Sequence, residues 1–317
     1  MLSRTANHLY WMARYIERAE TTARLLEVGG RNALMPDIGG GFRNDWEAIL
    51  RANGTLEMFN DKYGETVQRN IETFLFFDSD NPSSVLSCLN MARENARVVR
   101  TALTSSVWDA INSAYQELKQ FQRTERSKLE LSDLTEWTLR ATSLIRGCIE
   151  TTQLRNDGYH FMGSGFGIER GDNTARLLDV KYYVLLPSVS YVGSGLDQSQ
   201  WVTLLRSMSA HRAFSWSYPG ELTAAKIADF LILNRKFPRS LLSAVYQTCD
   251  HLDHIGRGYG SVSPSQAKVR EILAELAEAG VKDIFEEGLH EFLLRFMRQN
   301  GELAHTVQET YLQGTPT

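Results

Sequence analysis

Two similar groups of charged residues have the types and spacing needed to bind an anion or to transfer protons. In the first group, Glu17, Glu20 and Arg24 are separated by three and four residues, so they share one face of any helix that carries them. The second group lies 152 residues later and consists of Glu169, Asp172 and Arg176. These carboxylates can pair with arginines, or the guanidinium groups can hold a ligand carboxylate or phosphate.

These charges allow a structural and a functional interpretation. Each group includes a Glu-Arg motif, which adds Arg18 in the first group and Arg170 in the second. We favour a reciprocal ion-pair lock where two halves of the chain meet, because buried polar networks can specify one packing arrangement. The alternative is a binding or catalytic site, in which the doubled glutamates and the pair His8 and His160 would supply acid–base groups.

A basic stripe is a second candidate site. Arg93, Arg97 and Arg100 share one face of a predicted helix, and Asn95 lies within the same run. If the chain is duplicated, the corresponding residues of the second half are Cys249, Asp253 and Gly256. An exposed charged face is the favoured interpretation. A specialised binding surface on one half is the alternative.

Two histidine patterns resemble metal-ligand spacings. His251 and His254 have aspartates around them, and the runs 287–290 and 302–305 both read Glu-x-x-His. A di-iron bundle also needs glutamates from two other helices, whereas these two runs are only 15 residues apart. We therefore expect a solvated polar face, with no metal and no cofactor.

The run Gly163-Ser164-Gly165-Phe166-Gly167 precedes the second Glu-Arg helix. Glycines at a helix N-terminus can bind an anion through free N–H groups. No predicted strand precedes the run, so it is not a dinucleotide-binding motif. We expect a flexible or closely packed loop from 156 to 165. The spacing of Ser, His and Asp selects no catalytic triad.

The strongest pattern in the sequence is an internal repeat. Residues 16–28 and 168–180 are identical at nine of thirteen positions, and two further positions exchange Glu for Asp. Matches continue in order at offsets of 155 and then 156 residues, as expected for a duplication followed by small insertions. We place the repeats at about 1–155 and 156–317.

Apolar residues recur with helical spacing through nearly the whole chain. Helices are predicted over 84–121 and 266–280, with 134–155 and 284–312 as a further equivalent pair. The steps Asn81-Pro82 and Ser263-Pro264 indicate helix starts, and short loops are expected at 36–41 and 192–197. The sequence therefore predicts a single all-α helical-bundle domain over 1–317, built from two tandem pseudo-symmetric repeats.

Composition excludes several classes of protein. A net charge of −4 argues against a general nucleic-acid binder. No apolar run approaches the ~20 residues that cross a bilayer, and the N-terminus lacks the apolar core of a signal peptide. Three widely spaced cysteines fit a reducing compartment, so we expect a cytoplasmic protein. Arginine outnumbers lysine 26 to 8, through composition bias or a need for anion binding.

The chain resembles the bacterial alpha-E proteins, an all-helical family named for its Glu-Arg motif. The resemblance rests on the runs 15–20, 168–170, 93–112 and 234–240, the last of which contains Arg239. It covers essentially the whole chain, with Gly171 where the family motif usually has alanine. The family occurs beside or fused to circularly permuted ATP-grasp ligases and transglutaminase-like proteins. This implies a part in ATP-dependent amide bond formation or peptide modification.

Two hypotheses follow. In the first, the protein is an accessory partner that binds the ATP-grasp ligase and holds a peptide or acidic substrate at its arginines. In the second, it is an enzyme that acts on the peptide product with Glu and His as acid–base groups, which requires those side chains to converge in one pocket.

Overall fold

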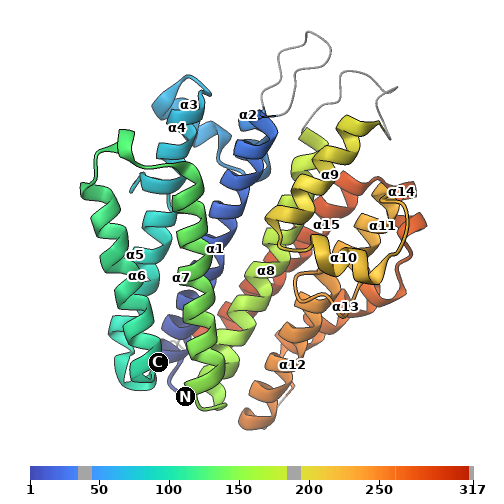
Figure 1. Ribbon diagram of the computed structural model, residues 1–317. Coiled ribbons are helices and arrows are strands. Elements are labelled where there is room, and N and C mark those ends of the chain that lie inside the picture. The colour runs from blue at the N-terminus through green and yellow to red at the C-terminus, as the bar shows by residue number, and fades with distance from the viewer. Residues whose placement is uncertain (35–44, 184–193, 261, 314–317) are drawn as a thin grey trace.

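The computed structural model describes residues 1–34, 45–183, 194–260 and 262–313, and every regular element in these ranges is a helix (Figure 1). The first half contains α1 (Ser3–Ala33), α2 (Asp45–Ala52), α3 (Leu56–Tyr63), α4 (Gln68–Glu72), η1 (Thr73–Phe77), α5 (Val85–Val98), η2 (Arg100–Ala102), α6 (Ser105–Arg123), η3 (Arg126–Lys128) and α7 (Leu131–Thr152). The second half contains α8 (Asp157–Tyr183), α9 (Gly195–Ser207), α10 (His211–Ser217), α11 (Ala224–Ala228), η5 (Asp229–Leu233), α12 (Leu241–Tyr259), α13 (Pro264–Glu278), α14 (Val281–Glu287), α15 (Leu289–Val307) and η6 (Gln308–Leu312). The predicted all-α fold is confirmed.

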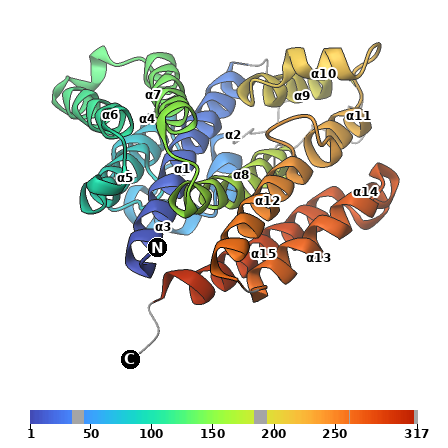
Figure 2. The same ribbon diagram turned by 90° about the horizontal axis from the view of Figure 1, so that it is seen from below.

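The long helices α1 and α8 lie side by side at the centre of the molecule. Two perpendicular views place α5, α6 and α7 on one side of this pair and α12, α13 and α15 on the other (Figure 1 and Figure 2). Helix α1 is buried over most of its surface, including the apolar residues Tyr10, Met12 and Ile16 and the charged residues Glu17 and Glu20. The charged face opposite the apolar stripe is therefore an interior surface.

Buried apolar residues of both halves form one contiguous core. This is the packing expected of a single domain, although the domain boundaries stay a prediction. Within the described ranges, no helix has the length and hydropathy required to span a membrane.

Several contacts recur in both halves at nearly constant sequence offsets. The hydroxyl of Thr22 donates to the carbonyl of Ser83 at 2.8 Å, and Thr174 donates to the carbonyl of Arg239 at the same distance. A cluster of three aromatic rings occurs twice, formed by Phe59, Tyr63 and Phe74 and by Phe214, Tyr218 and Phe230. These matches support the duplication, which stays a prediction from the sequence.

The helices that end the two halves, α7 and α15, also correspond. Aligned at an offset of 158 residues, both begin with leucine, at Leu131 and Leu289. Their buried positions then coincide as Leu134 with Phe292, Thr138 with Phe296, Thr142 with Asn300, Ile145 with Leu303 and Ile149 with Val307. Of the predicted pair, 134–155 lies mostly on α7, and 284–312 covers the end of α14, all of α15 and η6.

The glycine-rich run 163–167 is helical, so the predicted loop at 156–165 is wrong: α8 begins at Asp157. The glycines permit close helix packing instead. A Cβ atom on Gly165 would lie 2.6 Å from the carbonyl oxygen of Tyr10, and one on Gly163 would overlap the ring of His251. Because these residues lie inside a helix, their N–H groups are not those of a helix N-terminus.

The other predicted helix boundaries were met in part. Ser263 caps α13 in a capping box with Gln266, as the Ser-Pro step indicated. The predicted helix 84–121 is divided into α5 and α6 by the segment 99–104, and α5 begins after Ser84 rather than at Pro82. The predicted loop 36–41 lies outside the described residues. Of the predicted loop 192–197, the described part begins with Ser194, which caps α9, and continues into that helix, so a loop reaching Asp197 is wrong.

Candidate functional site

Helices α1 and α8 exchange Glu-Arg contacts. Arg18 of α1 donates to the two carboxylate oxygens of Glu169 at 2.6 and 3.1 Å. Arg170 of α8 donates to the two oxygens of Glu17 at 3.1 and 3.0 Å. Both carboxylates are buried. The two Glu-Arg motifs thus form the reciprocal arrangement that we favoured from the sequence.

Glu17 also belongs to a larger group of charges. Arg146 of α7 lies 2.7 Å from Glu17, and Arg239, just before α12, lies 3.1 Å from it. Both arginines contact Glu20 as well, and Arg24 lies 2.7 Å from Glu20. We call this set the Glu17 cluster; it consists of Glu17, Glu20, Arg24, Arg146, Arg170 and Arg239.

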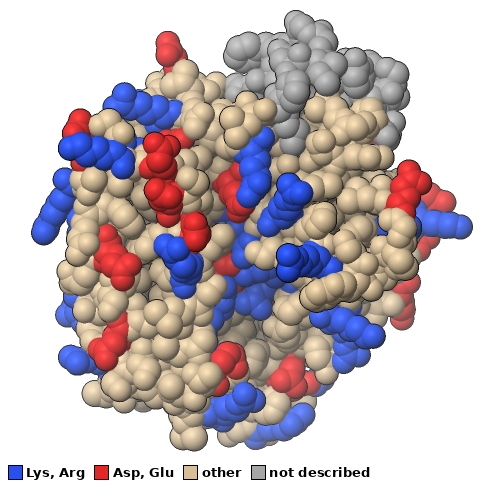
Figure 3. Space-filling model, viewed as in Figure 1, with Lys and Arg blue, Asp and Glu red and all other residues tan. Residues whose placement is uncertain are grey.

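The Glu17 cluster has more positive than negative charge. Four guanidinium groups contact two carboxylates, so these contacts leave two positive charges in excess. The side chains of Arg146, Arg170 and Arg239 are 18%, 13% and 17% exposed, whereas both glutamates are fully buried. These three arginines therefore form the outer part of the cluster, whereas Arg24 is buried. Figure 3 shows Lys and Arg side chains around a hollow near the middle of the face on which α7 and α12 lie.

The glutamates of the site are held in their ionised form. Burial by itself would raise the pKa of Glu17, but Arg170, Arg146 and Arg239 hold that pKa well below its usual range. Burial likewise opposes the ionisation of Glu20 and Glu169, and neighbouring arginines again lower the pKa of both. Burial lowers the pKa of Arg239 to about 10, although Glu20 partly opposes this effect.

The two halves differ around their carboxylates. Glu169 receives a second arginine, Arg14, whose Nε lies 2.7 Å from Oε2. At the corresponding positions, the second half has Phe166 in place of Arg14 and Ala304 in place of Arg146. The first half has Ser83 where the second has Arg239. The Glu17 cluster therefore occurs once, although the Glu-Arg motif occurs twice.

Arg24 and Arg176 bind helix ends in the opposite half. Arg24 donates to the carbonyl of Ser207 at the end of α9, and Arg176 donates to the carbonyl of Ala52 at the end of α2 at 3.2 Å. The last carbonyls of a helix lack partners within it, so a guanidinium group there is stabilising. Asp172 holds Arg176 in place at 2.6 Å. We attribute a structural role to these two arginines.

The basic stripe contacts α6 and its own helix. Arg93 donates to Asn112 at 3.0 Å and lies 4.4 Å from the ring centre of Tyr115. Arg97 pairs with Glu94 at 2.8 Å and is 60% exposed. Arg100 lies over Trp108 of α6, whereas Asn95 is buried and contacts His8 of α1. These contacts fit the exposed charged face that we favoured.

The histidines at positions 160, 251, 254, 290 and 305 each contact another histidine or a carboxylate. His160 and His251 approach at 3.1 Å between their Nδ1 atoms, and the rings of His160 and His254 stack at 4.4 Å. His290 contacts Asp179 at 2.6 Å and His305 contacts Glu309 at 3.2 Å. The residues that the structure describes include no group of three His, Cys, Asp or Glu side chains arranged to hold a metal.

This geometry does not favour acid–base catalysis by the doubled glutamates. Glu17 and Glu169 are buried, bound by arginines and held ionised, so neither has a proton to donate. His8 contacts Asn95 and His160 contacts His251, so the two histidines bind different partners. The required convergence in one pocket is not observed for these residues.

Arg146 was missed among the predicted site residues. It lies on α7, more than a hundred residues from its partners Glu17 and Glu20. One sequence feature could have identified Arg146. When α7 is aligned with α15, an arginine in the first half stands where the second half has Ala304.

Comparison with known proteins identifies a family whose description includes a Glu-Arg motif. The family model Alpha-E, described as "a predicted alpha-helical domain with a conserved ER motif", matches residues 1–312. No curated protein and no solved structure matches the chain. Since the match covers nearly the whole sequence and includes both Glu-Arg helices, the chain belongs to the Alpha-E family.

Proposed function

We propose that this protein is a non-catalytic partner of a circularly permuted ATP-grasp ligase, and that it holds an acidic peptide or another anionic substrate at the Glu17 cluster. In this proposal the ligase forms the amide bond. The Alpha-E protein presents the substrate, and a transglutaminase-like protein is a further candidate partner. Three free thiols support a cytoplasmic setting.

The observation that carries the proposal is the excess of guanidinium groups over carboxylates. Burying a charge without a partner is costly, so an excess of positive charge favours a bound anion. Arg146, Arg170 and Arg239 combine partial exposure with positions fixed by buried glutamates. Guanidinium groups held in this way can bind carboxylate or phosphate oxygens in pairs.

The anion site can be tested by titrating the protein with a short oligoglutamate peptide. We expect saturable binding that weakens as salt is added, because exposed ionic contacts are screened. Arg239→Ser and Arg146→Ala each introduce the residue of the other half and should weaken binding by about tenfold. Arg51→Ser, which removes a 50% exposed arginine from α2, should leave binding unchanged.

Partner binding needs a separate experiment. The purified protein should co-elute with a circularly permuted ATP-grasp ligase from the same organism, and its addition should raise the rate of amide formation by that ligase. A ligase that neither binds the protein nor changes its rate would refute the partner role. Loss of peptide binding without loss of ligase binding would refute only the substrate-presenting role.

A further inference from the structure

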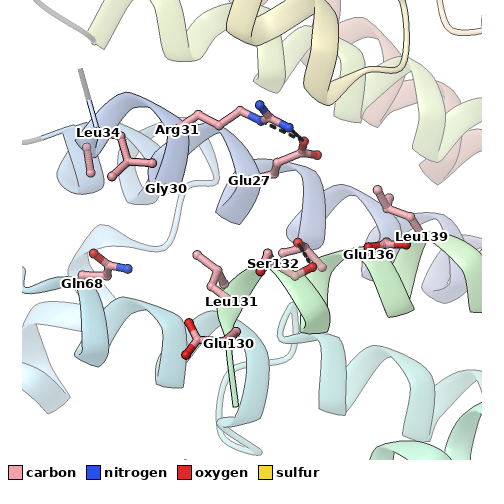
Figure 4. A pocket seen from close by; sticks show the side chains of 12 residues that line it. Glu27, Gly30, Arg31, Leu34, Gln68, Glu130, Leu131, Ser132, Glu136 and Leu139 are labelled. Atoms are coloured by element: carbon pink, nitrogen blue, oxygen red, sulfur yellow. Dashed lines mark hydrogen bonds and ion pairs between the residues drawn. The ribbon is translucent and has the colours of Figure 1, made fainter. Parts of the chain in front are cut away.

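The C-terminal part of α1 and the start of α7 border a pocket of about 550 Å³. Figure 4 shows Glu27 paired with Arg31 on α1, and Glu130 and Leu131 on the α7 side of the pocket. The volume falls in the range of small-molecule sites. We call this cavity the α1–α7 pocket. None of its lining residues belongs to the Glu17 cluster.

The second half shows what the equivalent space can contain. There the pocket between α8 and α15 has a volume of only about 290 Å³. The rings of Tyr182 and His290 stack in parallel at 3.8 Å, and Nδ1 of His290 lies 2.6 Å from the carboxylate of Asp179. An imidazole ring between a phenol ring and a carboxylate therefore fits this site.

The first half keeps the carboxylate and lacks both rings. At the offset of α1 and α8, Glu27 corresponds to Asp179 and Gly30 to Tyr182. At the offset of α7 and α15, Ser132 corresponds to His290. Glu27, Gly30 and Ser132 all line the larger pocket. The α1–α7 pocket lacks these two rings, which explains why it is the larger of the two pockets.

The lining of the α1–α7 pocket suits a cation with an apolar ring. Glu130 and Glu136 add two carboxylates to that of Glu27, while Leu131 and Leu139 provide apolar surface. Arg31 pairs with Glu27 at 2.9 Å, but Arg31 is 47% exposed, and an exposed pair of this kind is weak. Glu27 can therefore accept a hydrogen bond from a ligand.

We propose that the α1–α7 pocket binds a small aromatic cation with a ring N–H donor, such as an imidazolium compound. The ring would occupy the space that His290 and Tyr182 fill in the second half, and its N–H would donate to Glu27. This site is separate from the Glu17 cluster, so the proposal does not depend on the anion-binding function.

Histamine is a suitable probe because it combines an imidazole ring with an ammonium group. Calorimetric titration of the full chain should show saturable binding with a Kd in the micromolar to low millimolar range. Imidazole-4-acetate has the same ring with a negative side chain, and it should bind at least about tenfold more weakly. No saturable binding of histamine, or equal binding of the two compounds, would overturn the proposal.

Variants of the pocket give an independent test. Glu27→Gln should weaken histamine binding by about tenfold, since a hydrogen bond to a charged group is lost. Glu47→Gln is the matched control. Glu47 forms an ion pair with Arg51, four residues later on α2, as Glu27 does with Arg31, but Glu47 lies outside the pocket. An equal effect of both variants would contradict the proposed role of Glu27.

The double variant Gly30→Tyr/Ser132→His introduces the two rings of the second half. A Cβ on Gly30 would approach the side chain of Leu131 at 3.2 Å, which a small movement of that leucine relieves. We expect a folded protein that no longer binds histamine. Ser132→His alone serves if the double variant does not fold. Undiminished binding by a folded, ring-filled variant would refute this location of the site.

Discussion

Arg170 binds Glu17 through two hydrogen bonds, from Nε to Oε1 at 3.1 Å and from Nη2 to Oε2 at 3.0 Å. The two residues lie 153 positions apart in the sequence, on the helices that form the centre of the molecule. A bidentate pair fixes both the distance and the rotation between the helices. This contact and its counterpart from Arg18 to Glu169 therefore help to set how the halves meet.

Replacing Glu17 should destabilise the protein strongly. Glu17→Ala leaves Arg146, Arg170 and Arg239 without one of their carboxylate partners, and breaking a buried ion pair typically costs about 3–5 kcal/mol. Denaturant unfolding measures the loss. Glu136→Ala, which removes a 67% exposed carboxylate on α7, should cost less than about 1 kcal/mol. Similar losses in the two variants would contradict a structural role for the cluster.

The buried carboxylates should make the fold sensitive to acid. The pKa values of Glu17, Glu20 and Glu169 lie below the ordinary value of 4.5 in the folded chain. The unfolded chain therefore takes up protons first, so the contribution of these carboxylates to stability is present above pH 4.5 and is lost as the pH drops below it. Thermal melts across this range should show the decline. A variant lacking Glu169 should decline less steeply than the parent protein.

His251 should make stability depend on pH in a higher range than the glutamates do. Burial and the neighbouring His160 lower the pKa of His251 from 6.5 to about 4. Between these values the unfolded chain binds a proton that the folded chain does not, so stability falls as the pH drops. His251→Asn introduces the residue of the other half, because Asn95 corresponds to His251 and contacts His8. This variant should lose less stability than the parent protein between pH 6.5 and about 4. His305→Asn, at a 68% exposed position, is the control.

Gly165 should not tolerate a side chain. In Gly165→Ala the new Cβ would lie 2.6 Å from the Tyr10 carbonyl oxygen, which forces α1 and α8 apart at a cost of about 2 kcal/mol. Gly147 of α7 has nothing within 4 Å of the same atom, so Gly147→Ala should stabilise the helix by about 0.5–1 kcal/mol. Equal effects on unfolding would contradict the close packing of α1 against α8.

The local features of the fold could be predicted from sequence because they depend on near neighbours. Helical spacing and the Ser263-Pro264 step predicted an all-α chain and the start of α13. The loop predicted at the glycine run was wrong because glycine is common both in loops and where helices pack closely. Only the approach of Tyr10 to Gly165 in the structure distinguishes these two uses. The segment 99–104 was missed, since the apolar pattern continues from α5 into α6.

The sequence by itself determined that the chain is helical, that its Glu-Arg motif occurs twice, and that these charges share a helix face. Only the tertiary structure decided that this face is buried and that Arg146 and Arg239 converge on Glu17. Periodicity is a property of one helix, whereas the partner of a buried charge depends on how several helices pack. For the same reason, the α1–α7 pocket and the pocket between α8 and α15 can be compared only once the structure places Gly30 and Ser132 together.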